Sequence, residues 1–342
     1  MSESPLPPSL LREGRAMLAA LVADFLAIPG CHVVTTLDER LRESSPLPNS
    51  PLLDVEYLNE VLREQTAFDR LCTAADSTFI IAPETGGELR RRVQRVVNLG
   101  GRVLNCSSPA IDLCADKLRL AKHLLDRDVA TIQTRLVRID ENPWVDFLGD
   151  CVVKPRDGAG SWLTFRVPNR DTTAWQNACS SLMATGVIDR AIIQPYIEGQ
   201  PLSVGCLCDA SGNIEILPIA RQNLMGDTFQ YRGGSLPIEL DRQAVAAIRE
   251  LVRAACRSIE GLQGYVGVDL LLPDAEPNRP LIVEFNPRLT TSYVGYRKLC
   301  EDNIAERMLA LGSAHEPLSP LIWKPGLVTF GANGECQYSN IG

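Results

Sequence analysis

The chain has 342 residues, which is enough for two domains, or three small ones, at roughly 100–200 residues per domain. Hydrophobic residues make up 45% and charged residues 22%, which excludes a disordered, collagen-like or low-complexity chain. The formal net charge of −8 argues against a protein that binds duplex nucleic acid through a broad basic face, although a local basic pocket for a phosphate ligand remains compatible with it.

The sequence shows no sign of a membrane span, a secretory signal or a cysteine-based site. The apolar stretch 17–28 is short and is interrupted by Asp24, and the residues before it lack a basic signal start. We therefore expect a cytoplasmic protein with no membrane partner. The 11 cysteines contain no C-x-x-C pair, and Cys206 and Cys208 alternate as core residues of a strand do. Neither a zinc site nor a disulfide framework is expected.

The first third of the chain alternates helices and strands. Apolar residues three and four apart predict a helix over 10–28, which Pro29-Gly30 ends. Strands are predicted over 31–38, 77–83 and 102–106, with a helix over 88–101. This alternation indicates a parallel α/β sheet in a first domain, residues 1–112.

The rest of the chain predicts an α+β arrangement in two parts, 113–193 and 194–322, with a tail over 323–342. In the first part we expect a helix from 112 that runs into a short strand by 134, strands over 151–155, 162–167 and 191–199, and a helix over 172–184. In the second we expect antiparallel strands over 201–209, 213–221 and 230–240, a helix over 241–259, a strand hairpin over 264–287, and a helix over 306–312. The tail is loosely patterned.

Common enzyme signatures are missing, but a lysine precedes a glycine-containing loop. There is no P-loop, nucleophile elbow or H-E-x-x-H helix, and Leu163 breaks a dinucleotide fingerprint. The strand over 151–155 delivers Lys154 to the loop 157–161, where Gly158 and Gly160 let backbone amides approach an anion. Arg156 is a second candidate cation. Taken alone, the segment fits a surface hairpin equally well.

The hairpin over 264–287 carries a candidate metal site. Glu284 and Asn286 are two apart on one strand and share a face, and pairing can bring Asp269 beside them. Two carboxylates and an amide oxygen suit Mg²⁺ that is held partly by substrate phosphates. Their neighbours are apolar, so a merely solvated hairpin explains them poorly. Arg288 follows at once and can meet a phosphate.

A third motif is the apolar strand that leads into Gln194–Glu198. Such a hinge can offer backbone groups at Tyr196 and Ile197 to an adenine edge, and Glu198 to a ribose. By itself it is a common strand-to-turn sequence.

In this order the motifs resemble the ATP-grasp superfamily: Asp116-Lys117 at a helix start, Lys154 before the glycine loop, a hinge, and then the acidic pair with Asn286. The resemblance covers about residues 1–310 and implies an ATP-grasp fold with an N-terminal pre-ATP-grasp α/β domain. A closer likeness lies in EGRAMLAAL, FIIAPE and NPRLTTSYVGYR, which look like the tyramine–L-glutamate ligase group of methanofuran biosynthesis and its bacterial relatives.

The resemblance implies ATP and Mg²⁺ or Mn²⁺ as cofactors, with Asp269, Glu284 and Asn286 as metal ligands and Arg288, Lys154 and Arg221 as catalytic residues. It implies contacts to ATP from the two lysines, the loop and the hinge: Lys117, Lys154, Arg156, Gly158, Gly160, Ser161, Gln194, Tyr196, Ile197 and Glu198. Candidate substrate residues are Arg221, Tyr231, Gly233, Thr290 and Tyr293. A surface ion pair is equally expected for Arg221, and packing against other side chains is equally expected for Tyr293. Trp162 is expected either on a lid over the site or in the core.

Several positions depart from the family pattern. Gln194 replaces a common Glu, and Pro201 stands where a ribose-binding Glu often lies, so that Glu198 substitutes or the ribose is held weakly. Gly267 replaces an Arg of D-alanine–D-alanine ligases, which leaves Arg288, and Arg221 as a second candidate, for the transferring phosphate. The family's usual first strand and glycine-rich turn are missing before EGRAML.

The implied reaction is ATP-dependent joining of a carboxylate to an amine through an acylphosphate, with glutamate and a primary amine such as tyramine as substrates. The expected partners are small molecules, with no nucleic acid, and a homodimer is compatible with the resemblance. Two alternatives stay open: an ATP-grasp ligase for another amino acid or cofactor, and a non-catalytic nucleotide-binding scaffold.

Overall fold

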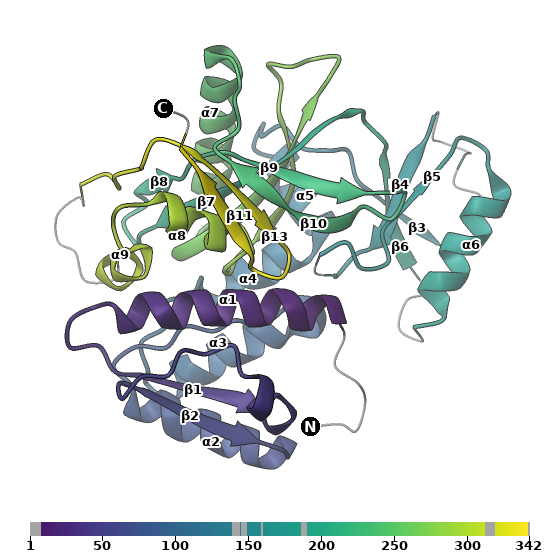
Figure 1. The fold of residues 1–342 in the computed structure, drawn as a ribbon. Helices are drawn as coiled ribbons and strands as arrows, with labels where there is room; N and C mark the ends of the chain where they lie inside the picture. Colours follow the sequence, from purple (N-terminus) through teal and green to yellow (C-terminus); the bar gives the residue numbers. More distant parts are fainter. Residues whose placement is uncertain are drawn as a thin grey trace.

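The computed structural model describes residues 8–138, 144, 149–158, 160–185, 190–311 and 319–340. Its strands form a parallel pair, a four-stranded sheet and an eight-stranded sheet. In Figure 1 the parallel pair lies at the bottom, the large sheet above it and the four-stranded sheet at the right. Helix α1 runs between the parallel pair and the large sheet. No helix in the described ranges is long and apolar enough to cross a bilayer.

The first unit combines a parallel strand pair with helices, as the sequence predicts. β1 (Val33–Asp38) and β2 (Leu53–Leu58) pair in parallel, with Val33 opposite Leu53. The sequence patterns do not predict β2 or the helix α2 (Val61–Ala74) that follows it. The helices of this unit, with two 3-10 turns, are α1 (Pro8–Leu26), η1 (Glu39–Ser44), α2 (Val61–Ala74), η2 (Thr85–Gly87), α3 (Glu88–Asn98) and α4 (Ser108–Ala115).

The strands predicted over 77–83 and 102–106 are not formed, and one parallel bridge joins Thr78 to Val103. The Asn105 side chain takes the place of further ladder bonds. Its Oδ1 accepts from the Ile80 amide at 2.8 Å, and its Nδ2 donates to the Ile80 carbonyl at 2.9 Å. A side-chain amide thus satisfies the backbone of a buried segment that would otherwise need a strand partner.

The helix predicted from residue 112 is two helices, α4 and α5 (Lys117–Leu125), separated at Asp116. Asp116 has extended backbone angles, and its carboxylate accepts from the Arg119 amide, so it caps α5. Lys117 therefore occupies the first position of α5. The strand expected by residue 134 begins later, as β3 (Arg135–Arg138).

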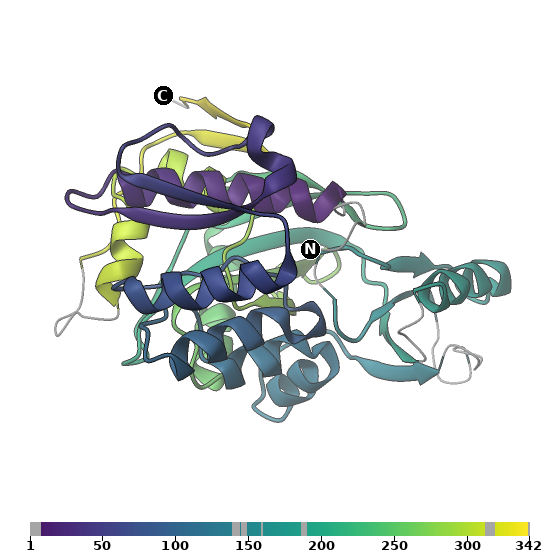
Figure 2. The same cartoon turned by 90° about the horizontal axis from the view of Figure 1, so that it is seen from below.

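The four-stranded sheet has the order β3-β6-β4-β5 and is antiparallel throughout. Helix α6 covers it at the edge of the molecule, with Trp175 and Leu182 buried against it (Figure 2). The remaining elements are β4 (Cys151–Pro155), β5 (Phe165–Val167), which is shorter than predicted, α6 (Thr172–Met183) and β6 (Arg190–Pro195).

The large sheet has the order β12-β11-β7-β9-β10-β13-β14, and β8 pairs with β7 outside this path. The predicted hairpin is confirmed, since β11 and β12 pair antiparallel with Asp269 opposite Glu284. The strand expected over 213–221 is split into β8 and β9. The elements are β7 (Gly199–Cys208), β8 (Ile214–Ile216), β9 (Ala220–Met225), β10 (Gln230–Leu236), α7 (Arg242–Ser258), β11 (Gly264–Pro273) and β12 (Leu281–Asn286).

The last residues are not a loose tail. β13 (Leu327–Gly331) pairs with β10, and β14 (Cys336–Ser339) pairs with β13, so the chain end adds two strands to the large sheet. Val328 and Phe330 are buried against α8 (Tyr293–Leu299) and α9 (Ile304–Leu311). This burial holds the end of the chain in the sheet.

Candidate active site

A cavity of about 210 Å³ lies between the four-stranded and the eight-stranded sheets. β4 and β6 line one wall, β7, β9, β10, β11 and β12 line the other, and α1 contributes a single side chain. The three sequence motifs, which are far apart along the chain, therefore converge on one cavity.

Lys154 of β4 lines the cavity, whereas Lys117 of α5 lies outside the lining and meets the site through Glu284. Lys154 lies near the end of β4 and is 6% exposed. Lys117 Nζ forms an ion pair with Glu284 Oε2 at 3.1 Å and donates to the Gly158 carbonyl at 2.6 Å. Two buried cations thus lie beside the carboxylates of the hairpin.

Antiparallel pairing of β11 and β12 places the two acids together. Asp269 is directly opposite Glu284, and Asn286 follows on the same face of β12. Asp269 accepts from Gln222 Nε2 and from Asn286 Nδ2, both at 2.9 Å. The structure therefore brings together the three predicted metal ligands.

Burial and the mutual charges shift the ionisation of this group. Burial lowers the pKa of Lys154 to about 8, which Glu284 and Asp269 oppose and Lys117 reinforces. Burial, reinforced by Glu284, raises the pKa of Asp269 to about 7. Burial would also raise the pKa of Glu284, but Lys117 and Lys154 outweigh it, so that this pKa lies below its usual value.

These residues fit a hard divalent cation. A cation beside Asp269 would favour the ionised carboxylate that burial and Glu284 disfavour. The Asn286 Oδ1 atom lies 3.5 Å from Arg288 Nη2, a long contact that leaves the amide oxygen able to bind a cation. Oxygen donors of this kind, completed by substrate phosphates, are typical of Mg²⁺ sites.

Arg288 lines the cavity next to the acidic pair. Its Nε donates to Glu84 Oε2 at 2.9 Å, and its Nη1 donates to the Leu289 carbonyl at 3.0 Å. Glu84 and the Leu289 carbonyl therefore hold the guanidinium beside the acidic pair, where the sequence predicts it.

The glycine loop meets the cavity through part of its length. Gly160 and Ser161 line it, and Ser161 Oγ donates to the Phe229 carbonyl. The loop residue Ala159 lies outside the described residues. Trp162 is 47% exposed, which favours a lid position over a core position.

The placement of Arg156 corrects the expectation that it contacts a phosphate. Its guanidinium forms an ion pair with Asp116, the cap of α5, and lies outside the cavity lining. Arg156 thus pairs with the Asp116 carboxylate of the protein rather than with an anion in the cavity.

Part of the hinge lines the cavity. Gln194 is buried, and its Nε2 donates to Thr134 Oγ1 at 2.8 Å, while Tyr196 and Ile197 line the cavity. Glu198 is exposed and lies outside the lining, so its placement argues against the predicted ribose contact. Its carbonyl accepts instead from the Asp274 amide at 3.1 Å.

The predicted substrate residues separate into two groups. Tyr231 and Thr290 line the cavity. Arg221 lies on the other face of β9 from Gln222, is exposed, and donates to Gln200 Oε1 at 3.3 Å, so the expected catalytic and substrate roles are not supported.

Gly233 and Tyr293 also lie outside the cavity lining. A Cβ atom at Gly233 would lie 1.9 Å from the Phe330 carbonyl oxygen, so this glycine lets β10 approach β13. Tyr293 is fully buried, and its hydroxyl donates to Asp24 Oδ2 at 2.6 Å. Stacking of Tyr293 on an amine is therefore corrected to packing.

The sequence analysis missed Glu13, the residue that α1 contributes to the cavity. Its carboxylate accepts from Thr291 Oγ1 at 3.4 Å, and burial raises its pKa. The sole sequence signal was the string EGRAML, which carried the resemblance without a role for its acid. It also missed Glu84, the partner of Arg288, in the string FIIAPE.

Comparison with known proteins agrees with this geometry. A family model for the ATP-grasp domain matches residues 114–292, just over half of the chain, and one for the pre ATP-grasp 3 domain matches residues 31–111. A curated relative, the tyramine–L-glutamate ligase of Methanocaldococcus fervens, is 25% identical over 309 residues, which cover 88% of this chain and 87% of the relative.

Solved structures show the same fold at lower identity. An ATP-grasp superfamily protein from Archaeoglobus fulgidus is 22% identical with a TM-score of 0.67, over 95% of this chain and 88% of that one. The L-amino acid ligase of Bacillus licheniformis is 17% identical with a TM-score of 0.69, over 93% of this chain and 76% of that one. On the match over residues 114–292, the chain belongs to the ATP-grasp family.

Proposed function

We propose that the protein is an ATP-dependent ligase that joins a carboxylic acid to an amine. The observation that carries the proposal is that Lys154, Asp269, Glu284 and Arg288 line one cavity, with Lys117 paired to Glu284 beside it. Two cations, two acids and an arginine are what a site needs to hold a polyphosphate and transfer its terminal phosphoryl group.

In this proposal each side chain has a separate task. Lys117 and Lys154 neutralise phosphate oxygens of ATP, and the backbone of Tyr196 and Ile197 holds the adenine edge. The glycine loop 157–161 covers the phosphates and excludes water. Asp269, Glu284 and Asn286 would hold Mg²⁺ or Mn²⁺, which would further neutralise the phosphate charge.

The reaction runs in two steps. An oxygen of the acid's carboxylate attacks the γ-phosphorus, and the bond to ADP breaks, which leaves an acylphosphate. Arg288 stabilises the charge that develops on the transferring group. The amine nitrogen then attacks the acyl carbon and loses a proton, and inorganic phosphate leaves with the bonding electrons. The product is an amide, and no covalent enzyme intermediate is needed.

We further propose glutamate as the acid and a primary amine such as tyramine as its partner, in the cytoplasmic synthesis of a methanofuran-type C1 carrier. The relative in Methanocaldococcus fervens supports this choice. The carboxylate of Glu13 and the ring of Tyr231 also support it, because both line the cavity and suit an ammonium group and an aromatic ring. The protein acts on small molecules, as a monomer or a homodimer.

The test is release of phosphate from Mg-ATP with L-glutamate and a panel of amines that includes tyramine, with mass spectrometry of the products. We expect release that requires both substrates, together with a γ-glutamyl amide. Phosphate release with a different amino acid in place of L-glutamate would support the ligase reaction but identify another acid substrate. ATP binding without release for any pair would favour the non-catalytic scaffold. Glu284→Gln serves as the inactive control.

A further inference from the structure

A turn of the first domain contacts Arg288 of the cavity lining from outside the cavity. It spans residues 84–87, between the partly buried segment 79–83 and helix α3. Glu84 is 4% exposed and forms an ion pair with Arg288, 204 residues further along the chain. The reaction proposed above leaves Glu84 without a task, although it is a buried carboxylate beside Arg288.

The Arg288 guanidinium depends on Glu84 for its orientation. Glu84 accepts from Nε at 2.9 Å, the Leu289 carbonyl accepts from Nη1 at 3.0 Å, and Asn286 Oδ1 lies 3.5 Å from Nη2. The Leu289 carbonyl belongs to the next residue of the chain and the contact to Asn286 is long. The charge-assisted bond to Glu84 is therefore the strongest restraint from outside the segment that carries Arg288.

A second contact fixes the same turn against the glycine loop. The Gly86 amide donates to Asp157 Oδ2 at 2.9 Å, and Asp157 is the first residue of the loop. Gly86 and Gly87 have φ of 63° and 71°, a left-handed conformation that glycine adopts without strain. The two glycines thus turn the chain so that Glu84 and the Gly86 amide meet two different parts of the site.

We propose that Glu84 is a positioning residue, which orients Arg288 toward the transferring phosphoryl group from the first domain. The inference rests on the proposed ligase function. Removal of its charge frees the guanidinium to turn away from the cavity. A misplaced catalytic group of this kind costs about 10²-fold in rate, whereas ATP itself remains bound by the lysines and the hinge.

The test compares Glu84→Gln with Glu88→Gln. Glu88 begins α3 directly after the turn and pairs with Arg91 and Arg92 instead of Arg288, so it controls for the loss of an ion pair there. We expect kcat for amide formation to fall about 10²-fold in Glu84→Gln, with the Kd of Mg-ATP within about threefold of wild type. We expect Glu88→Gln to keep kcat within about twofold.

A double-mutant cycle separates positioning from general structure. In an Arg288→Lys background, Glu84→Gln should cause no further loss of kcat, because the group that it positions is already altered. If the fold-losses in kcat of the two single variants multiply in the double variant, the proposal is overturned. A Glu84→Gln variant with wild-type kcat would also overturn it. Where Glu84→Gln folds poorly, Glu84→Asp takes its place in the cycle, since it keeps the charge and shortens its reach.

A measurement without turnover distinguishes this inference from the proposed function. MgADP with aluminium fluoride mimics the transferring phosphoryl group, and its binding can be followed by calorimetry. We expect Glu84→Gln to weaken this complex at least tenfold more than it weakens Mg-ATP binding. If wild type binds the mimic but releases no phosphate with any substrate pair, the proposed substrates fail, while this ratio still decides the role of Glu84.

Discussion

Lys154, Asp269 and Glu284 line the cavity together, Lys117 pairs with Glu284 beside them, and the charges of these side chains depend on one another. Burial lowers the pKa of Lys154 to about 8, and burial, reinforced by Glu284 directly opposite, raises the pKa of Asp269 to about 7, so that Asp269 is about half protonated near pH 7. Such a group is poised to accept a polyphosphate and a divalent cation, which supply the charges that its burial leaves unbalanced.

Removal of one charge from this wall should stop turnover. We expect Lys154→Ala and Glu284→Gln to lower kcat by about 10³-fold or more, because each loses a group that neutralises or holds the phosphates. Phosphate release under saturating Mg-ATP measures the effect. Circular dichroism should show an unchanged fold for both variants, and near wild-type turnover in either would contradict the site.

The affinity for metal should depend on pH through Asp269. Burial first, and then Glu284, raises the pKa of Asp269 to about 7, and a protonated carboxyl group cannot bind a cation. Below pH 7 a proton therefore competes with the metal, and the affinity for Mn²⁺ should fall about tenfold per pH unit; above pH 7 it should level off. Calorimetric titration with Mn²⁺ alone, from pH 5.5 to 8.5, measures the slope.

The control for this prediction is Asp269→Asn, which removes the titrating group. Its binding of Mn²⁺ should be weak and nearly independent of pH. Wild type at pH 6 should release close to one proton on binding, detected by comparing buffers with different enthalpies of ionisation. Binding at pH 6 without proton release would show that Asp269 is already ionised in the free protein.

At the scale of elements, the contact of β10 with β13 depends on one glycine. Gly233 has φ of 116°, and a Cβ atom there would lie 1.9 Å from the Phe330 carbonyl oxygen. Gly233→Ala should lower the free energy of unfolding by about 3 kcal/mol, because strain and a backbone clash add. Gly212→Ala is the matched control, since its φ is 85° with no atom within 4 Å of the added Cβ.

Chemical denaturation measures both glycine variants. We expect Gly212→Ala to lose about 1 kcal/mol, from strain alone. Equal losses in the two variants would mean that β13 moves away from β10 at no cost, so that the chain end adds little to the large sheet.

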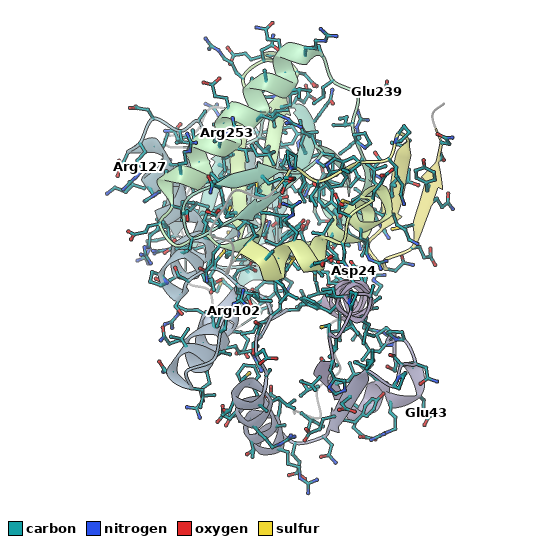
Figure 3. All side chains as sticks on the ribbon, turned by 90° about the vertical axis from the view of Figure 1, so that its left-hand side faces the viewer. Asp24, Glu43, Arg102, Arg127, Glu239 and Arg253 are labelled. Atoms are coloured by element: carbon teal, nitrogen blue, oxygen red, sulfur yellow. The ribbon has the colours of Figure 1, made fainter. Side chains whose placement is uncertain are left out.

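Helix α8 is joined to α1 through Asp24, which Figure 3 labels where α1 faces the C-terminal helices. Asp24 accepts from the Tyr293 hydroxyl at 2.6 Å and pairs with Arg297. Tyr293→Phe should therefore lower the free energy of unfolding by about 1–3 kcal/mol and leave the KM for the amine unchanged. Thermal denaturation and steady-state kinetics measure the two effects.

Tyr231→Phe is the comparison, because Tyr231 lines the cavity. It should change the KM for the amine more than it changes stability. A raised KM in Tyr293→Phe, with unchanged stability, would restore the stacking role that the sequence suggests for Tyr293.

At the scale of the whole molecule, the cavity is an assembly of distant segments. Its lining runs from Glu13 in α1 to Ser292 before α8, and Glu84 of the first domain holds Arg288 from behind. The first domain is thus joined to the active site through α1 and the 84–87 turn. The homodimer and the three boundaries between the four parts proposed from the sequence stay predictions.

The sequence alone determined the features that local periodicity encodes. Lys154 before a glycine loop follows from one strand and the turn after it, and Asp269 opposite Glu284 follows from alternation within one hairpin. Tertiary structure alone decided that Glu13 and Glu84 reach the site, that Arg221 turns away from it and that Tyr293 is buried. A local pattern reports that a side chain is buried, but its partner is set by the packing of segments that lie far apart in the chain.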